Sequence, residues 1–95
     1  MGAQRHLKKL AYLSWVRQGD DESLQTWLQR FIKATMEVGH LFDDAILLAT
    51  SSAVRKDTPL EFSISKKPPW AYVDFLDRAK NYVNAEAHKG LPRKP

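Results

Sequence analysis

Residues 18–31, QGDDESLQTWLQRF, decide the fold of this chain. The first six are polar residues and one glycine, a composition typical of a turn. In the segment that follows, apolar or small side chains recur three and four positions apart: Leu24, Trp27, Leu28, Phe31, Ile32 and Thr35. This spacing is that of one face of a helix. We therefore predict a polar turn and then an amphipathic helix that ends near Gly39, a residue suited to a helix C-terminus.

Helical spacing continues on both sides of this stretch. We expect helices over about Ala3–Trp15, from Asp43 or Asp44 as N-cap to about Arg55, over a short segment after Thr58, and from Pro69 or Trp70 to about His88. Thr58 should cap the short helix, with Pro59 at its first position and Glu61 completing a capping box. The inward stripe expected for the last helix is Trp70, Val73, Leu76, Ala79 or Lys80, and Val83, with Tyr72, Phe75 and Tyr82 alongside it. The prediction is an all-α domain of four to five helices over residues 1–90, with a disordered tail at 91–95.

The composition narrows the class of protein. A chain of 95 residues with 43% hydrophobic and 27% charged residues is typical of one globular domain. It contains no cysteine, which excludes disulfides, thiolate zinc sites and iron–sulfur clusters, and we expect an intracellular, cytoplasmic protein. No apolar run approaches the roughly 20 residues of a membrane span, so we expect no membrane partner.

Motifs for catalysis and cofactor binding are missing from the sequence. The three histidines, His6, His40 and His88, lack the spacing of metal ligands. Four glycines are too dispersed for a phosphate-binding loop, and no serine stands in a GxSxG motif. We therefore predict no enzyme activity, no metal and no cofactor.

Charge is unevenly distributed along the chain. Residues 1–19 contain four basic residues and no acid, whereas residues 20–44 contain six acids and two basic residues. The basic ends suggest a secondary possibility, a nucleic-acid-binding module that uses Arg5, Lys8, Lys9, Lys89, Arg93 and Lys94. The alternative is that these residues are ordinary solvated surface charge.

Two features go beyond simple helix patterning. If the turn folds back onto the helix, Arg30 could donate to Glu22 and to the amide oxygen of Gln18. The alternative is that the three are unrelated surface side chains.

In the helix expected over 43–55, Leu47, Ser51 and Val54 lie opposite the main apolar side. Either a partner or the N-terminal segment would cover this second face.

The stretch Gln18-Gly19-x-x-Glu22-x-Leu24-x-x-Trp27-x-x-Arg30-Phe31 resembles the major homology region of retroviral and retrotransposon Gag capsid proteins. The later stretch from Pro68 to Glu86, PPWAYVDFLDRAKNYVNAE, is similar to an ending common in Gag proteins of plant Ty3/gypsy-type elements. The resemblance as a whole covers about residues 8–87.

This resemblance implies the C-terminal lobe of a capsid, a small helical domain that self-associates during shell assembly. It implies a buried hydrogen-bond network of Gln18, Glu22 and Arg30, and a tight turn at Gly19. It also implies a dimer contact on the helix over 43–55, which assigns the interface to Leu47, Leu48, Ser51 and Val54. The partner would be a second copy of this chain, in a weak homodimer or higher assembly, or another protein bound through residues 43–55. The chain departs from the family at residues 50–55, TSSAVR, which are smaller and more polar than is usual there, and it lacks a zinc knuckle.

Overall fold

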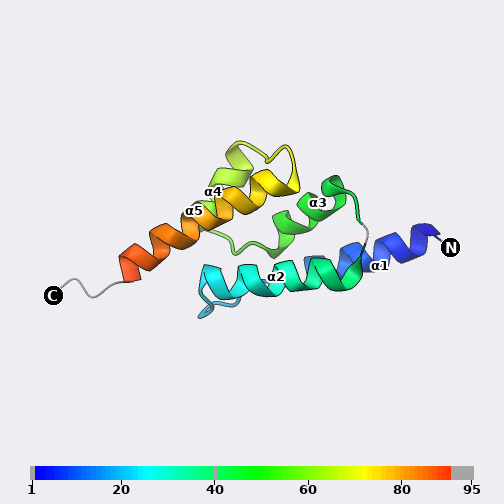
Figure 1. Cartoon of the computed structure of the whole chain (residues 1–95), viewed down its shortest axis with the longest axis horizontal. Coiled ribbons are helices and arrows are strands. Elements are labelled where there is room, and N and C mark those ends of the chain that lie inside the picture. Colours follow the sequence, from blue (N-terminus) through cyan, green and yellow to red (C-terminus); the bar gives the residue numbers. More distant parts are fainter. Residues whose placement is uncertain (1, 40, 91–95) are drawn as a thin grey trace.

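The computed structural model describes the backbone of residues 2–39 and 41–90 and the side chains of residues 8–39 and 41–87. These ranges contain helices and turns but no strand, which confirms the all-α prediction for the described part of the chain. The helices are α1 (Gly2–Ser14), α2 (Leu24–Val38), α3 (Asp43–Ala53), α4 (Pro59–Lys66) and α5 (Tyr72–Gly90). α1 and α5 extend to opposite ends of the long axis (Figure 1). The tail expected at 91–95 lies outside the described residues.

Helix α2 has the bounds and the buried face that the sequence predicts. The side chain of Ser23 caps it, because Ser23 Oγ accepts a hydrogen bond from the Thr26 N–H at 3.2 Å. The helix ends at Gly39, whose φ of 80° is a backbone conformation that favours glycine. Its buried residues are Leu24, Trp27, Leu28, Phe31, Ala34 and Thr35.

The centre of the core is an aromatic cluster formed by α2 and α5. The rings of Trp27 and Phe31 stack with their centroids 5.2 Å apart, and each centroid lies 6.3 Å from that of Phe75 on α5. All three side chains are fully buried. Edge-to-face and offset contacts of this kind add to the free energy gained by burying apolar surface.

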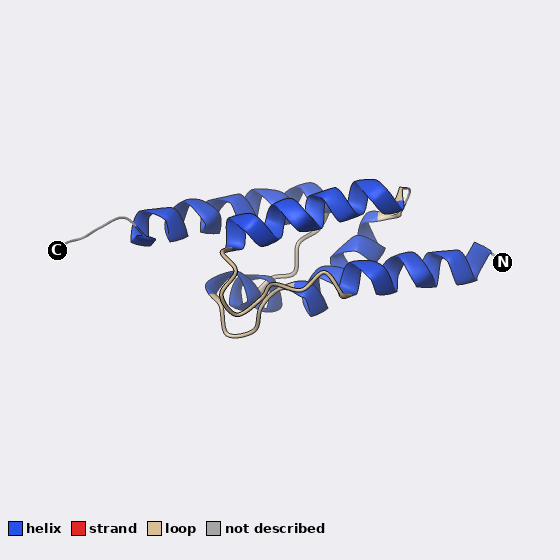
Figure 2. Cartoon of the chain, turned by 90° about the horizontal axis from the view of Figure 1, so that it is seen from below, coloured by secondary structure: helices blue, strands red, loops and turns tan. Residues whose placement is uncertain are grey.

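Helices α2 and α5 run antiparallel, side by side (Figure 2). At one end, the hydroxyls of Thr35 and Tyr72 lie 3.3 Å apart. At the other end, a carboxylate oxygen of Glu86 accepts from the backbone N–H of Leu24 at 2.9 Å. This places the negative charge of Glu86 at the N-terminus of α2, where the helix dipole favours it.

The start of α3 differs from the prediction. The N-cap is Phe42, which supplies no side-chain hydrogen bond, whereas Asp43 and Asp44 lie in the first helical turn. The reason is a tertiary contact: Asp43 Oδ2 accepts from the N–H of Tyr72 at 3.0 Å. The carboxylate predicted to cap its own helix therefore holds the first residue of α5 instead.

Helix α4 begins as predicted, because Thr58 Oγ1 accepts from the Glu61 N–H at 3.2 Å. Helix α5 begins at Tyr72, two residues after Trp70, so its predicted start at Pro69 or Trp70 is wrong. The predicted inward face is also wrong at this end, since Trp70 and Val73 are exposed and Phe75 is fully buried, whereas Ala79 is buried as predicted. Packing of Phe75 against the aromatic side chains of α2 sets the rotation of α5 about its axis.

No helix among the described residues is both long and apolar enough to cross a bilayer.

Candidate functional site

The turn that joins α1 to α2 is held between α2 and the end of α3. The indole N–H of Trp27 donates to the carbonyl oxygen of Val16 at 2.7 Å. Two residues later, the backbone N–H of Gln18 donates to the carbonyl oxygen of Ala53 at 3.1 Å. Because Trp27 is itself fully buried, the first contact fixes the turn to the core.

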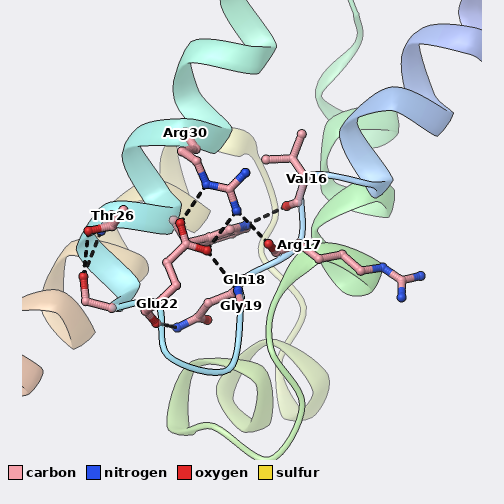
Figure 3. A network of polar contacts seen from close by, with 9 residues as sticks. Val16, Arg17, Gln18, Gly19, Glu22, Thr26 and Arg30 are labelled. Atoms are coloured by element: carbon pink, nitrogen blue, oxygen red, sulfur yellow. Dashed lines mark hydrogen bonds and ion pairs between the residues drawn. The ribbon is translucent and has the colours of Figure 1, made fainter.

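Arg30 links this turn to α2 through three hydrogen bonds (Figure 3). Its Nε donates to Glu22 Oε2 at 2.7 Å, and its Nη2 donates to Glu22 Oε1 at 2.8 Å. The same Nη2 donates to the backbone carbonyl of Arg17 at 2.7 Å. The paired contacts to Glu22 use the planar fork of the guanidinium, a geometry that an ammonium group cannot reproduce.

The other two residues named from the sequence also bond to Glu22. The backbone N–H of Gly19 donates to Glu22 Oε1 at 2.9 Å, and Gln18 Nε2 donates to the Glu22 carbonyl oxygen at 3.0 Å. The structure thus brings Gln18, Gly19, Glu22 and Arg30 together in one hydrogen-bonded turn.

Three details of the expected network are corrected. The amide oxygen of Gln18 does not accept from Arg30; the Arg17 carbonyl takes that position, and Gln18 Oε1 is buried with no hydrogen-bond partner among the described residues. The pair is not buried as a unit, because the Arg30 side chain is 48% exposed although that of Glu22 is only 16% exposed. Gly19 is not required by backbone strain, since a Cβ there would meet the Glu22 Cβ at 3.6 Å, an ordinary contact.

The contacts shift the pKa values of both charged partners. The hydrogen bonds from Arg30, assisted by the Gly19 N–H, lower the pKa of the Glu22 carboxyl, although partial burial acts in the opposite direction. The bond to Glu22 raises the pKa of Arg30 in turn. Both shifts favour the charged pair.

The Glu22 shift predicts a stability change with pH. Because the folded-state pKa is lower than the unfolded one, the stabilisation is complete above the ordinary glutamate pKa of roughly 4.3 and is lost as the pH falls through the folded-state value. We expect urea unfolding between about pH 7 and 3 to show a larger loss of stability for the wild type than for Glu22→Gln. Parallel pH profiles for the two proteins would contradict the pairing.

The predicted interface on α3 is corrected in part. Val54 is only 1% exposed and Leu47 packs against the core, so neither offers an open face. α3 ends at Ala53, and the extended backbone of Val54 (φ −69°, ψ 135°) turns its side chain inward, where helical periodicity no longer applies. Helix α1 also packs along α3. Leu48, at 61%, and Ser51 remain exposed.

The basic residues named for nucleic-acid contact are placed only in part. Lys8 is exposed and Lys9 is partly buried on α1. The side chains of Arg5 and Lys89, and all of Arg93 and Lys94, lie outside the described residues. Of the six basic residues, only Lys8 and Lys9 therefore have described side chains.

Sequence reasoning missed two charged residues that tie helices together. Arg78 donates to Asp74 Oδ2 at 2.8 Å and to the backbone carbonyls of Ser63 and Lys67, and so closes the connection between α4 and α5. The i,i+4 spacing of Asp74 and Arg78 was a readable signal for the ion pair. Nothing local signalled that Glu86 would cap α2, because the two groups are 62 residues apart.

No group of three or more histidine, aspartate or glutamate side chains suited to a metal occurs in the part of the chain that the structure describes. Comparison of the chain with known protein families, with curated proteins and with solved structures gave no match.

Proposed function

We propose that this chain is a protein–protein association module of the Gag capsid type, which forms a weak homodimer. The supporting observation is the hydrogen-bonded turn: the glutamine, glycine, glutamate and arginine of the motif all take part in one network with Glu22 at its centre. Glu22 and Arg30 are only eight positions apart, but their side chains could equally have pointed away from each other into solvent. Their convergence is what the resemblance implies, and it supports the proposed homology of fold with a capsid C-terminal lobe.

The proposed contact is the exposed side of α3, centred on Leu48. Asp44, Ser51 and Ser52 are also exposed and lie three or four positions from Leu48, so they surround it with polar groups. An apolar side chain within a polar rim is the arrangement of a small interface. In a two-fold dimer the same patch serves both copies, so each Leu48 would contact the α3 helix of its partner.

The test is sedimentation equilibrium from roughly micromolar to millimolar concentration, which spans the affinities of small interfaces. We expect a concentration-dependent dimer that Leu48→Asp weakens by at least about 30-fold, the effect of losing a central interface residue. Because Leu48 is exposed in the monomer, the variant should keep the helix content and melting temperature of the wild type.

The matched control is Phe62→Asp, since Phe62 is 65% exposed on α4. It introduces the same charge at a similarly exposed apolar position outside the proposed contact and should leave the dimer unchanged. A strict monomer at millimolar concentration would contradict the proposed function. A dimer that resists Leu48→Asp but not Phe62→Asp would reject the α3 contact.

A further inference from the structure

A hollow of about 800 Å³ lies between the turn at residues 17–20 and the connection from α3 to α4. Three cationic side chains line it: Arg17 from the turn, and Arg55 and Lys56 from the connection. Asp20 and Asp57 are the acids on its wall. Because the cations come from segments nearly forty residues apart, no stretch of sequence reveals the cluster.

The ammonium group of Lys56 donates to the carbonyl oxygen of Ser51 at 3.0 Å, which leaves its other two N–H groups for a ligand, whereas the side chains of Arg17 and Arg55 form no hydrogen bond in the described residues. The structure describes the side chains of four arginines, and two of them, Arg30 and Arg78, form ion pairs and bond to backbone carbonyls. Neither Arg17 nor Arg55 pairs with a carboxylate in the described ranges, and Figure 3 shows the Arg17 side chain extending away from Glu22 and Arg30. Both guanidinium groups are therefore available to an anion.

An exposed indole adjoins this cluster. Trp15 is 81% exposed, the highest value among the large apolar side chains that the structure describes. A second hollow, of about 290 Å³, lies between Trp15 and Arg17. Arg17 lines both hollows, so the two adjoin at this residue, and we term the residues Trp15, Arg17, Arg55 and Lys56 the Trp15 platform.

We propose that the Trp15 platform binds single-stranded nucleic acid, with a base stacked on Trp15 and the adjoining phosphates on Arg17, Arg55 and Lys56. An aromatic platform beside a groove of cations is the combination that holds single strands, because every base has a face to stack and every phosphate a charge. An acidic peptide would use the cations but not the indole. A duplex would offer phosphates but no unstacked base.

The probe is a fluorescein-labelled thymidine octanucleotide, with binding followed by anisotropy of the full chain at roughly 50 mM salt and above. For three phosphate contacts, the logarithm of affinity should fall with the logarithm of salt concentration with a slope of about −2. Trp15→Ala should weaken binding by roughly 5- to 150-fold, the effect of losing one stacked base. Arg17→Gln should weaken it and reduce the magnitude of the slope by about 0.7.

These variants should fold, because no hydrogen bond from either side chain occurs in the described part of the structure and Arg30 uses only the backbone carbonyl of Arg17. The controls are Trp70→Ala, which removes an indole that is 78% exposed and does not line either hollow, and Lys66→Gln, which removes a distant charge. Both should bind as the wild type does. Asp57→Asn should bind more tightly, since it removes a repelling charge while asparagine tolerates the positive φ of 63°.

Four results would each overturn the proposal. The first is no binding at low salt, and the second is equal affinity for duplex DNA of the same length. The third is a Trp15→Ala variant that binds like the wild type, which would show that the indole does not contribute and that binding is non-specific charge attraction. The fourth is tighter binding of a glutamate octapeptide than of the oligonucleotide, which would assign the cations to an acidic protein partner.

Discussion

Val54→Asp is expected to unfold the chain rather than to disrupt a dimer. Val54 is only 1% exposed, belongs to the core cluster, and donates its backbone N–H to the carbonyl of Thr50 as the C-cap of α3. A carboxylate there would be buried among the apolar side chains of the core cluster, which costs about 4 kcal/mol. That is a large share of the roughly 5–15 kcal/mol that stabilises a domain. Circular dichroism should show loss of helix or a strongly lowered melting temperature.

The matched variant is Ser51→Asp, three positions earlier on the exposed side of the same helix. It adds the same charge near the same helix end, so the two variants differ mainly in the exposure of the substituted position. We expect its free energy of unfolding to stay within about 0.5 kcal/mol of the wild type. A folded Val54→Asp variant with normal melting would show that the end of α3 does not pack into the core.

Arg30→Ala is expected to lower the free energy of unfolding by about 1–3 kcal/mol. The substitution removes two bonds to Glu22 and one to the Arg17 carbonyl, and leaves a largely buried carboxylate with the Gly19 N–H as its remaining side-chain partner. A fully buried pair would cost about 3–5 kcal/mol when broken, and an exposed one about 0–1. The expected loss of free energy lies between these two figures because Arg30 is half exposed whereas Glu22 is largely buried. Urea unfolding at neutral pH measures this loss.

Two comparison variants separate the roles of charge and geometry. Arg30→Lys keeps the charge but not the planar fork, so it should recover only part of the lost stability. Arg17→Ala should have little effect, because Arg30 bonds to the backbone of Arg17 and not to its side chain. Equal melting of Arg30→Ala and the wild type would show that the turn is held by Trp27 and Gln18 alone.

The elements predicted best are those whose signals are local. Thr58 caps α4 as predicted, through the backbone N–H of Glu61 three residues later, so the contact lies within one turn of the chain. Ser23, predicted only as part of the polar turn, caps α2 in the same way. Gly39 ends α2 because of its own backbone conformation. Periodicity identified the buried side of α2 correctly because Trp27 and Phe31 are large and flanked by polar residues.

Prediction failed where two interpretations of a pattern were equally good. At the start of α5, Val73 and Phe75 are both apolar and lie on different sides of the helix, and only packing against Trp27 and Phe31 selects Phe75 for the core. Val54 follows the last helical residue, so a helical wheel assigned it to the wrong face. For Arg30, the spacing offered Glu22 as a partner but left pairing and solvation both open, and the resemblance favoured the pair.

The sequence by itself determined that the chain is helical, where α2 and α4 begin, and which residues of the 18–30 turn are able to pair. These features depend on groups within a few residues of one another, whose separation the backbone geometry limits. The tertiary structure alone decided that Glu86 caps α2, that Asp43 holds α5, that Val54 is buried, and that Arg17 and Arg55 line one hollow. These features depend on how each helix is rotated about its axis and crossed against the others. Contacts between residues far apart in the sequence decide that arrangement, so a local pattern does not reveal it.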